Sequence, residues 1–185
     1  TGFTKVDVKE AVNRDVSLRY DEATGYLGTS VTTGKELLKV SPYDRIFILR
    51  KSGVYTVMDI PDRLFVDTGM WYCGFAEKEV LSQILFTVIY KDEKTQYPYI
   101  KRARVESYIL NRDYLFVPDT ATVLYASTAE NFEFTVQYAP KPRTKKNEAR
   151  FTTADYPEKG LKAQGVRLAE REAEAAAPVT KKSKK

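Results

Sequence analysis

The chain has 185 residues, of which 43% are hydrophobic and 12% aromatic, and its formal net charge is +5. The hydrophobic content supports a globular core, and 13 tyrosines and 9 phenylalanines favour sheet over helix. The absence of histidine and the single cysteine, Cys73, exclude His-based catalysis, His metal sites and an internal disulfide, while the mild basic excess permits a polyanionic partner.

The first predicted element is a hairpin within residues 17–31, SLRYDEATGYLGTSV, which turns near Ala23-Thr24-Gly25. A second hairpin pairs RIFIL (45–49) with VYTVMDI (54–60) around Lys51-Ser52-Gly53. Because RIFIL carries apolar residues on both faces, we expect this strand to lie inside a stack of sheets.

Two further hairpins are predicted downstream. ILFTVIY (84–90) and YPYIKRARV (97–105) flank a short charged turn, whereas FEFTVQY (132–138) and EARFTTA (148–154) flank a loop rich in proline and lysine. Within FEFTVQY, apolar and polar residues alternate, so its apolar side chains share one face of a strand.

Two phrases recur along the chain. LFVD (64–67) returns as LFVPD (115–119), and FTVIY (86–90) returns as FTVQY (134–138), at nearly the same interval. Self-similarity of this period indicates a repeated β unit. We therefore predict an all-β, propeller-like fold of about three to four blades, each roughly 45–50 residues long. The alternative is an ordinary antiparallel barrel or sandwich whose hairpins are similar by chance.

The composition changes near residue 168. The end of the chain, RLAEREAEAAAPVTKKSKK, contains an Ala/Glu-rich stretch at about Leu168 to Ala177 that favours a short helix, then Pro178 and four lysines. We predict two segments: a β domain at 1–168, and a helical stretch with a disordered Lys-rich tail at 169–185.

Neither a membrane span nor a secretion signal is evident. No run approaches the roughly 18–20 apolar residues that a span requires, and the start, TGFTKVDVKEAV, has no signal-peptide core. A single cysteine fits a reducing cytoplasm. Because the sequence does not begin with Met, we expect it to be a piece of a longer protein.

No enzyme motif is present, so we predict neither catalytic residues nor a metal site. Phosphate-binding glycine loops, a nucleophile elbow and Cys/His clusters at metal spacing are all missing. Cys73 lies in MWYCGF among bulky apolar neighbours and is interpreted as a packed thiol. Trp71, in the same stretch, is interpreted as a core residue.

Basic residues collect in the predicted turns and in one strand. If the hairpins radiate from a common axis, equivalent turns project from one rim, and cations there would release counterions from a duplex. Such contacts carry no base sequence information. The alternative, solubility charges, is favoured for Lys91 and Lys94, which Asp92 and Glu93 offset. The candidate phosphate contacts are Arg50, Lys51, Lys101, Arg102, Arg104, Lys141, Arg143, Lys145, Lys146, Arg150, Lys159 and Lys162.

Three stretches resemble a known family. YDRIFILRKSGVYTVMDIP, TVIYKDEKTQYPYIKRARVESYILNRDYLF and FTVQYAPKPRTKKNEARFTTADYPEKGLKAQG are similar to the C-terminal repeats of bacterial type IIA topoisomerase A subunits, found in gyrase and topoisomerase IV. The resemblance runs from about Asp15 to Gly165. It implies a β-pinwheel, in which neighbouring blades exchange strands, with a basic rim that binds duplex DNA.

For the whole enzyme, the resemblance implies ATP-driven strand passage. The partners would be duplex DNA, the remainder of the A subunit, and the ATPase B subunit, in the cytoplasm at the nucleoid and not at a membrane. Magnesium and ATP would bind elsewhere, with no cofactor in this domain. The DNA-cleaving tyrosine of the family belongs to an upstream domain, so no tyrosine here is assigned that role.

One departure from the family matters for function. Gyrases carry a Gln-Arg-Arg-Gly-Gly-Arg-Gly box, whereas the nearest stretch here is KGLKAQG (159–165), which lacks the arginines. This favours a topoisomerase IV-like role. The length implies fewer blades than six, so an open crescent is expected as an alternative to a closed disc. The competing functions are a propeller-like protein-interaction module without a nucleic-acid role and, more remotely, a β-rich hydrolase that uses carboxylates.

Overall fold

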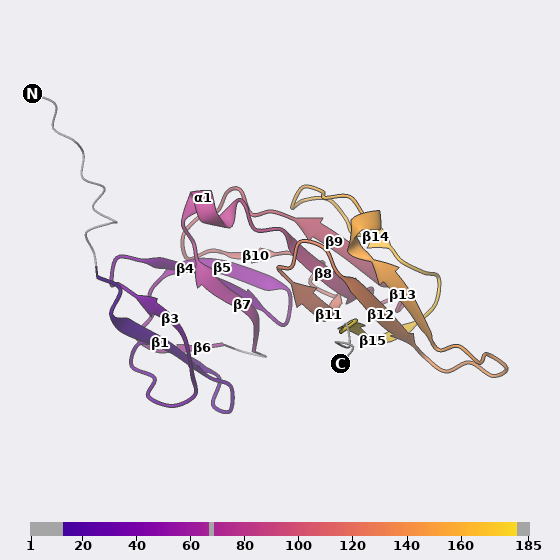
Figure 1. The fold of residues 1–185 in the computed structure, drawn as a ribbon, viewed down its shortest axis with the longest axis horizontal. Coiled ribbons are helices and arrows are strands. Elements are labelled where there is room, and N and C mark those ends of the chain that lie inside the picture. The colour runs from indigo at the N-terminus through magenta and orange to yellow at the C-terminus, as the bar shows by residue number, and fades with distance from the viewer. Residues whose placement is uncertain (1–12, 67–68, 181–185) are drawn as a thin grey trace, which may run out of the picture.

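The computed structural model describes residues 13–66 and 69–180, which form an almost entirely β structure (Figure 1). Besides the strands, these residues contain the short helix α1 (Lys78–Leu81) and one turn of 3₁₀ helix at Thr153–Asp155. The strands are β1 (Val16–Asp21), β2 (Tyr26–Gly28), β3 (Lys35–Val40), β4 (Arg45–Arg50), β5 (Val54–Asp59), β6 (Leu64–Phe65), β7 (Met70–Phe75), β8 (Phe86–Lys91), β9 (Pro98–Ala103), β10 (Asp113–Leu115), β11 (Thr122–Ser127), β12 (Glu133–Tyr138), β13 (Glu148–Thr152), β14 (Val166–Arg167) and β15 (Ala173–Pro178).

The strands form four antiparallel sheets, which we call blades 1 to 4. Their strand orders are β3-β1-β2-β6, β10-β5-β4-β7, β11-β8-β9-β14 and β13-β12-β15. The blades follow one another along the long axis of the molecule (Figure 1). None of the sheets in the described residues closes into a barrel. The predicted all-β, open pinwheel-like fold is confirmed.

Each blade is built around one of the four predicted hairpins. In blades 2 to 4, after the hairpin, the chain crosses to the preceding blade as a short exchanged strand and then returns to pair with the first strand of its own hairpin. Thus β6 leaves the β4–β5 hairpin to pair with β2, and β7 returns to β4. The strands β10 and β14 cross in the same way to β5 and β9. Neighbouring blades are therefore linked by backbone hydrogen bonds.

The recurring LFV phrase belongs to these exchanged strands. The Val66 amide donates to the Gly25 carbonyl over 2.7 Å, and the equivalent Phe116 amide donates to Gly53 over 2.9 Å. Both side chains are buried, at 1% and 0% exposure. Val66 is the third residue of its phrase and Phe116 the second, so the two copies are offset by one residue in the structure. What recurs at the same place is one inward apolar residue after the crossing strand, beside the hairpin turn of the preceding blade.

The first unit has no exchanged strand. Only residues 29–34 separate β2 from β3, whereas residues 104–121 separate β9 from β11 and have room for one. At the other end, β13 pairs with β12 and with no further strand of the described residues. Blade 1 therefore sends no strand to another blade, and blade 4 receives none beside β13. The described blades form an open row and not a closed ring.

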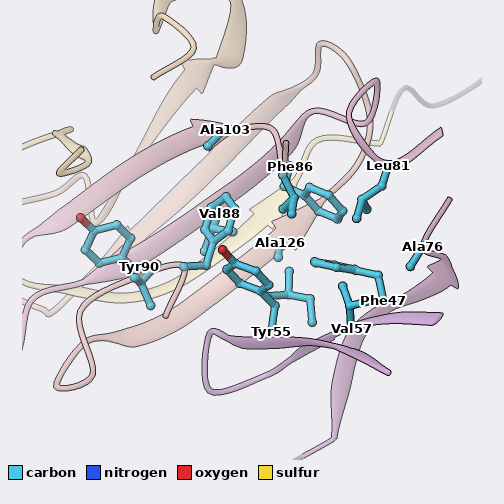
Figure 2. Packing of buried hydrophobic residues seen from close by; sticks show 14 residues of the cluster. Phe47, Tyr55, Val57, Ala76, Leu81, Phe86, Val88, Tyr90, Ala103 and Ala126 are labelled. Atoms are coloured by element: carbon cyan, nitrogen blue, oxygen red, sulfur yellow. The ribbon is translucent and has the colours of Figure 1, made fainter. Parts of the chain in front are cut away.

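Three apolar clusters lie between successive blades. Phe47 of β4 and Phe86 of β8 pack 5.0 Å apart, between ring centroids, in the cluster that joins blades 2 and 3 (Figure 2). Ile46 and Ile48 of the same strand β4 belong instead to the cluster between blades 1 and 2. Alternation thus sends successive β4 residues into two different cores, which confirms that this strand is buried on both faces.

The predicted C-terminal helix is wrong. Residues 173–178 form β15, which pairs with β12 and places Ala176 opposite Val136. The Ala/Glu composition favours helix only as a local preference, and pairing with an otherwise open edge of β12 outweighs it. Sheet structure therefore continues to Pro178, past the predicted boundary at residue 168. The last part of the predicted disordered tail, residues 181–185, lies outside the described residues.

Candidate nucleic-acid interface

The four hairpin turns lie next to one another along one edge of the molecule. Between blades 1 and 2, the Lys51 amide donates to the Gly69 carbonyl over 3.0 Å. A Cβ placed on Gly69 would lie 3.4 Å from the Lys51 Cδ and 3.5 Å from the Tyr20 hydroxyl. Gly69 therefore connects the turn end of β1 with the turn that follows β4.

The same succession continues through blades 3 and 4. A Cβ on Gly53, in the turn of blade 2, would lie 3.2 Å from Val123, which pairs with Tyr90 near the turn of blade 3. The Ala173 amide donates to Gln96 of that turn over 2.8 Å, and the Ala139 amide, in the loop of blade 4, donates to Glu172 over 3.0 Å. We call the surface formed by turns 22–25, 51–53, 92–97 and 139–147 the turn edge.

Charge changes sign along the turn edge. The turn of blade 1 is acidic because of Asp21 and Glu22, and the turn of blade 2 is basic because of Lys51. In blade 3, Lys91 and Lys94 stand next to Asp92 and Glu93 in the chain, so this turn has no net charge. The strongest positive charge lies in blade 4, in the loop that contains Lys141, Arg143, Lys145 and Lys146.

Residues 139–147, which we call the basic loop, project beyond the sheet of blade 4 (Figure 1). All four cationic side chains are exposed, and the loop contains no carboxylate. None of the four forms an ion pair with the rest of the described chain. The Thr144 amide donates to the Lys141 carbonyl over 3.2 Å, and Arg143 adopts a φ of 70°, so the loop contains a tight turn.

Arg50 and Lys51 occupy the turn end of blade 2. Lys51 is exposed, and its Nζ lies 5.6 Å from the centroid of the Trp71 ring. Arg50 is half-buried, and its Nε has no hydrogen-bond partner among the described residues. Trp71 is itself half-buried and packs against the core, which agrees with its interpretation as a core residue.

Lys101 and Arg102 do not lie on the surface, so their prediction as phosphate contacts is corrected. They are 6% and 7% exposed. The Lys101 Nζ donates to the carbonyls of Phe116 and Leu161, over 2.7 and 2.5 Å. Burial lowers the pKa of Lys101. Because β9 is covered on both faces, alternation alone could not place either cation in solvent.

Arg102 is held still more extensively than Lys101. One of its terminal nitrogens donates to the carbonyls of Thr153 and Tyr156, over 2.8 and 3.0 Å. The other donates to the Glu130 carbonyl over 2.6 Å. These bonds tie blade 3 to both ends of the blade 4 hairpin.

The remaining candidates lie away from the basic loop or are paired. Arg104 forms a 2.8 Å ion pair with Glu158, and Arg150 pairs with Glu133 across β12 and β13. Lys159 and Lys162 are exposed. However, the Lys159 amide bonds to the Arg102 carbonyl at the end of β9 opposite its hairpin turn. The structure thus brings together only part of the predicted set.

Sequence reasoning missed Arg171, which contacts the base of the basic loop from the segment before β15. The sequence prediction placed Arg171 in a helix at about Leu168 to Ala177, and this helix gave no reason to expect a contact with the basic loop. Nothing else in the sequence pattern indicates that Arg171 contacts this loop.

The described residues show neither a reactive cysteine nor a cluster of metal-ligating side chains. Cys73 packs into the core between blades 1 and 2, and burial raises the pKa of its thiol to about 12, as expected of a packed thiol. The described part of the chain contains no group of three or more potential metal-ligating side chains. It also contains no helix long and apolar enough to cross a membrane.

Comparison with known proteins gives two matches. A family model described as topoisomerase C-terminal domain, Bacteroidota, matches residues 17–178. The A subunit of DNA topoisomerase 4 from Borreliella burgdorferi is 25% identical to this chain over 111 residues. That alignment covers 60% of this chain but only 18% of the relative's length.

Proposed function

Because this chain belongs to the family of topoisomerase C-terminal domains of Bacteroidota, we propose that it binds duplex DNA along its turn edge for a type II topoisomerase. The observation that carries the proposal is the basic loop, which exposes four cations and contains no carboxylate. Unpaired surface cations bind phosphates by releasing counterions from the duplex. Binding through phosphates alone would be independent of base sequence.

In this proposal the domain positions or bends a DNA segment, and catalysis belongs to the rest of the enzyme. Duplex passage would use ATP and magnesium bound outside this chain, together with the remainder of the A subunit plus an ATPase B subunit. The enzyme would act in the cytoplasm, at the nucleoid. We further propose a topoisomerase IV-like role, since the stretch at 159–165 lacks the arginines of the gyrase box.

The same stretch also packs against the fold. The Leu161 carbonyl accepts from Lys101, and the Gly165 amide donates to the Tyr90 hydroxyl over 3.2 Å. The segment therefore anchors the chain to blade 3, and its exposed lysines lie at the end of β9 away from the turn edge. A duplex held at the turn edge would not reach them without wrapping around the molecule.

The test is a titration of duplex DNA by fluorescence anisotropy across salt, from about 50 to 200 mM. The variant Lys141→Ala/Arg143→Ala/Lys145→Ala/Lys146→Ala should reduce the slope of log K against log salt by up to about 3–4, since each lost phosphate contact contributes about 0.9. Affinity at low salt should fall with it. Two duplexes of unrelated sequence should give the same values.

A matched control removes four positive charges from the opposite end of the blades. Lys39, Arg45, Lys78 and Arg112 lie at strand ends away from the turns or in α1. Replacing all four with Ala should leave the slope nearly unchanged. Equal slopes for the wild type and the basic-loop variant would remove the loop from the interface. The pair Lys159→Ala/Lys162→Ala tests the opposite end directly, and a lower slope there would contradict the proposed path.

The alternative, a protein-interaction module, predicts apolar pockets. One cavity, lined by Trp71, Tyr72 and Phe86, measures about 190 Å³, below the size of ordinary ligand pockets. Another measures about 300 Å³, but polar side chains, Gln83, Arg104, Thr128 and Glu130, supply most of its lining. Exposed apolar side chains lie on different elements, for example Phe65 of β6 in blade 1, Leu115 of β10 in blade 2 and Val80 of α1. These features give the alternative less support than the basic loop gives DNA binding.

A further inference from the structure

The base of the basic loop is held by one arginine. The terminal nitrogens of Arg171 donate to the carbonyl of Lys146 over 2.8 Å and to the carbonyl of Ala139 over 3.2 Å. One of them also donates to Asn147 Oδ1 over 2.9 Å. The guanidinium carbon lies 4.9 Å from the centroid of the Tyr138 ring. Arg171 therefore contacts both ends of the loop at once.

The β12–β13 ladder cannot provide this restraint by itself. Its last paired residues are Gln137 and Glu148, followed by one bond from the Tyr138 amide to the Asn147 carbonyl over 2.7 Å. Beyond that point the two chains diverge into the loop. The planar guanidinium carries its donors on separate nitrogens in a fixed fork, so it bridges acceptors on both chains, whereas an ammonium must reach all its acceptors from one nitrogen.

The same segment fixes the loop against blade 3. Glu172 accepts from the Ala139 amide, and the next residue, Ala173, donates to Gln96 in the blade 3 turn. The Lys91 Nζ donates to the Ala173 carbonyl over 3.4 Å. Residues 171–173 thus connect the base of the basic loop with the neighbouring turn, and set the direction in which the loop projects.

We propose that Arg171 is a positioning residue that preorganises the basic loop for phosphate binding. The inference rests on the proposed DNA-binding function and assigns no phosphate contact to Arg171, because three of its four terminal N–H groups already donate to the chain. A loop ordered before binding avoids part of the entropic cost of fixing its side chains on DNA. The expected effect is on affinity, and not on the number of phosphates contacted.

The test compares Arg171→Ala, Arg171→Lys and Arg167→Ala in the same salt titration. Arg167 is exposed and pairs with Glu170. Arg167→Ala is a matched control, because it removes one positive charge only four residues away from Arg171. We expect Arg171→Ala to weaken binding about three- to tenfold at fixed salt, with the salt slope unchanged. Arg171→Lys, which keeps the charge, should recover only part of the affinity. Arg167→Ala should stay within about twofold of the wild type.

Limited digestion with trypsin supplies a measurement that does not involve DNA. Cleavage after Arg143, Lys145 and Lys146, followed by mass spectrometry, should accelerate in Arg171→Ala and not in Arg167→Ala. Equal loop cleavage and equal affinity in Arg171→Ala and the wild type would overturn the inference. A reduced slope would also overturn it, since Arg171 would then contact phosphate. Absence of salt-dependent binding by the wild type would refute DNA binding itself, while loop cleavage would still report on Arg171.

Discussion

Lys101 and Arg102 place two positive charges in the interior of blade 3, where both donate hydrogen bonds to backbone carbonyls. A basic residue in a strand normally indicates a solvated face. Here the strand is covered on both sides by segments that cross between blades, so the cations serve as buried donors. Their role is to join segments distant in sequence by donating to backbone carbonyls of those segments.

Arg102→Ala should therefore reduce stability and leave the salt slope of DNA binding unchanged. The substitution removes the Arg102 hydrogen bonds to the carbonyls of Tyr156 and Glu130 and one of the two donors to the Thr153 carbonyl. We expect this loss to cost about 3 kcal/mol of unfolding free energy. Urea denaturation measures this loss. Arg104→Ala, two residues away and partly exposed in an ion pair, should cost at most about 1 kcal/mol. A smaller salt slope for Arg102→Ala would restore this residue to the interface.

At the scale of elements, the exchanged strand is the unit that distinguishes this fold from a row of separate hairpins. Its sequence signal is the inward apolar residue that docks beside a hairpin turn, which is Val66 in one copy of LFV and Phe116, one position earlier in the phrase, in the other. Its pairing partner is not encoded locally, since β6 and β10 consist of two and three residues. Which sheet such a short strand joins depends on the blade already assembled beside it.

The turn glycine that receives an exchanged strand should tolerate no side chain. Gly53 adopts a φ of 90°, and a Cβ there would lie 2.5 Å from Val117. Gly53→Ala should lower the unfolding free energy by about 2 kcal/mol, from backbone strain and the clash together.

Gly160→Ala provides the matched control for that prediction. No atom lies within 4 Å of a Cβ at position 160, so the change should stay within about 0.5 kcal/mol. Thermal or urea unfolding of the two variants measures the difference. Equal stabilities would show that the exchanged strand does not pack closely against the turn.

At the scale of the whole molecule, stability comes from three clusters shared between adjacent blades, and these contain buried tyrosines. Burial raises the pKa of Tyr55 to about 12 and also raises the pKa of Tyr72 and Tyr90, in the cluster between blades 2 and 3. It raises the pKa of Tyr138 between blades 3 and 4 as well. Each phenol is therefore kept neutral by folding at pH values where the unfolded chain ionises.

Alkaline pH should unfold the domain for this reason. A raised tyrosine pKa contributes stability that is fully present below the unfolded value of about 10 and is lost as pH rises towards about 12. The lowered pKa of Lys101 acts in the opposite direction over part of this range, but it is one group against these four tyrosines and the Cys73 thiol, whose pKa is also raised. We expect a loss of at least about 2 kcal/mol between about pH 9 and pH 11.5.

Urea midpoints at both pH values measure the loss, and tyrosinate absorbance shows when the phenols ionise. In the folded protein a fraction of the tyrosines should ionise only as the domain unfolds. A urea midpoint independent of pH over this range would contradict the assignment of these tyrosines to the core.

Alternation, turn residues and repetition were enough to predict the four hairpins, the all-β class, the doubly buried strand β4 and the position of the basic loop. These signals act over neighbouring residues and are visible in one chain. They could not predict that Lys101 and Arg102 are internal, that residues 173–178 form a strand, or that Arg171 closes the basic loop. Each of these depends on a segment that crosses from another blade and offers hydrogen-bond partners worth more than the local preference of the residues concerned.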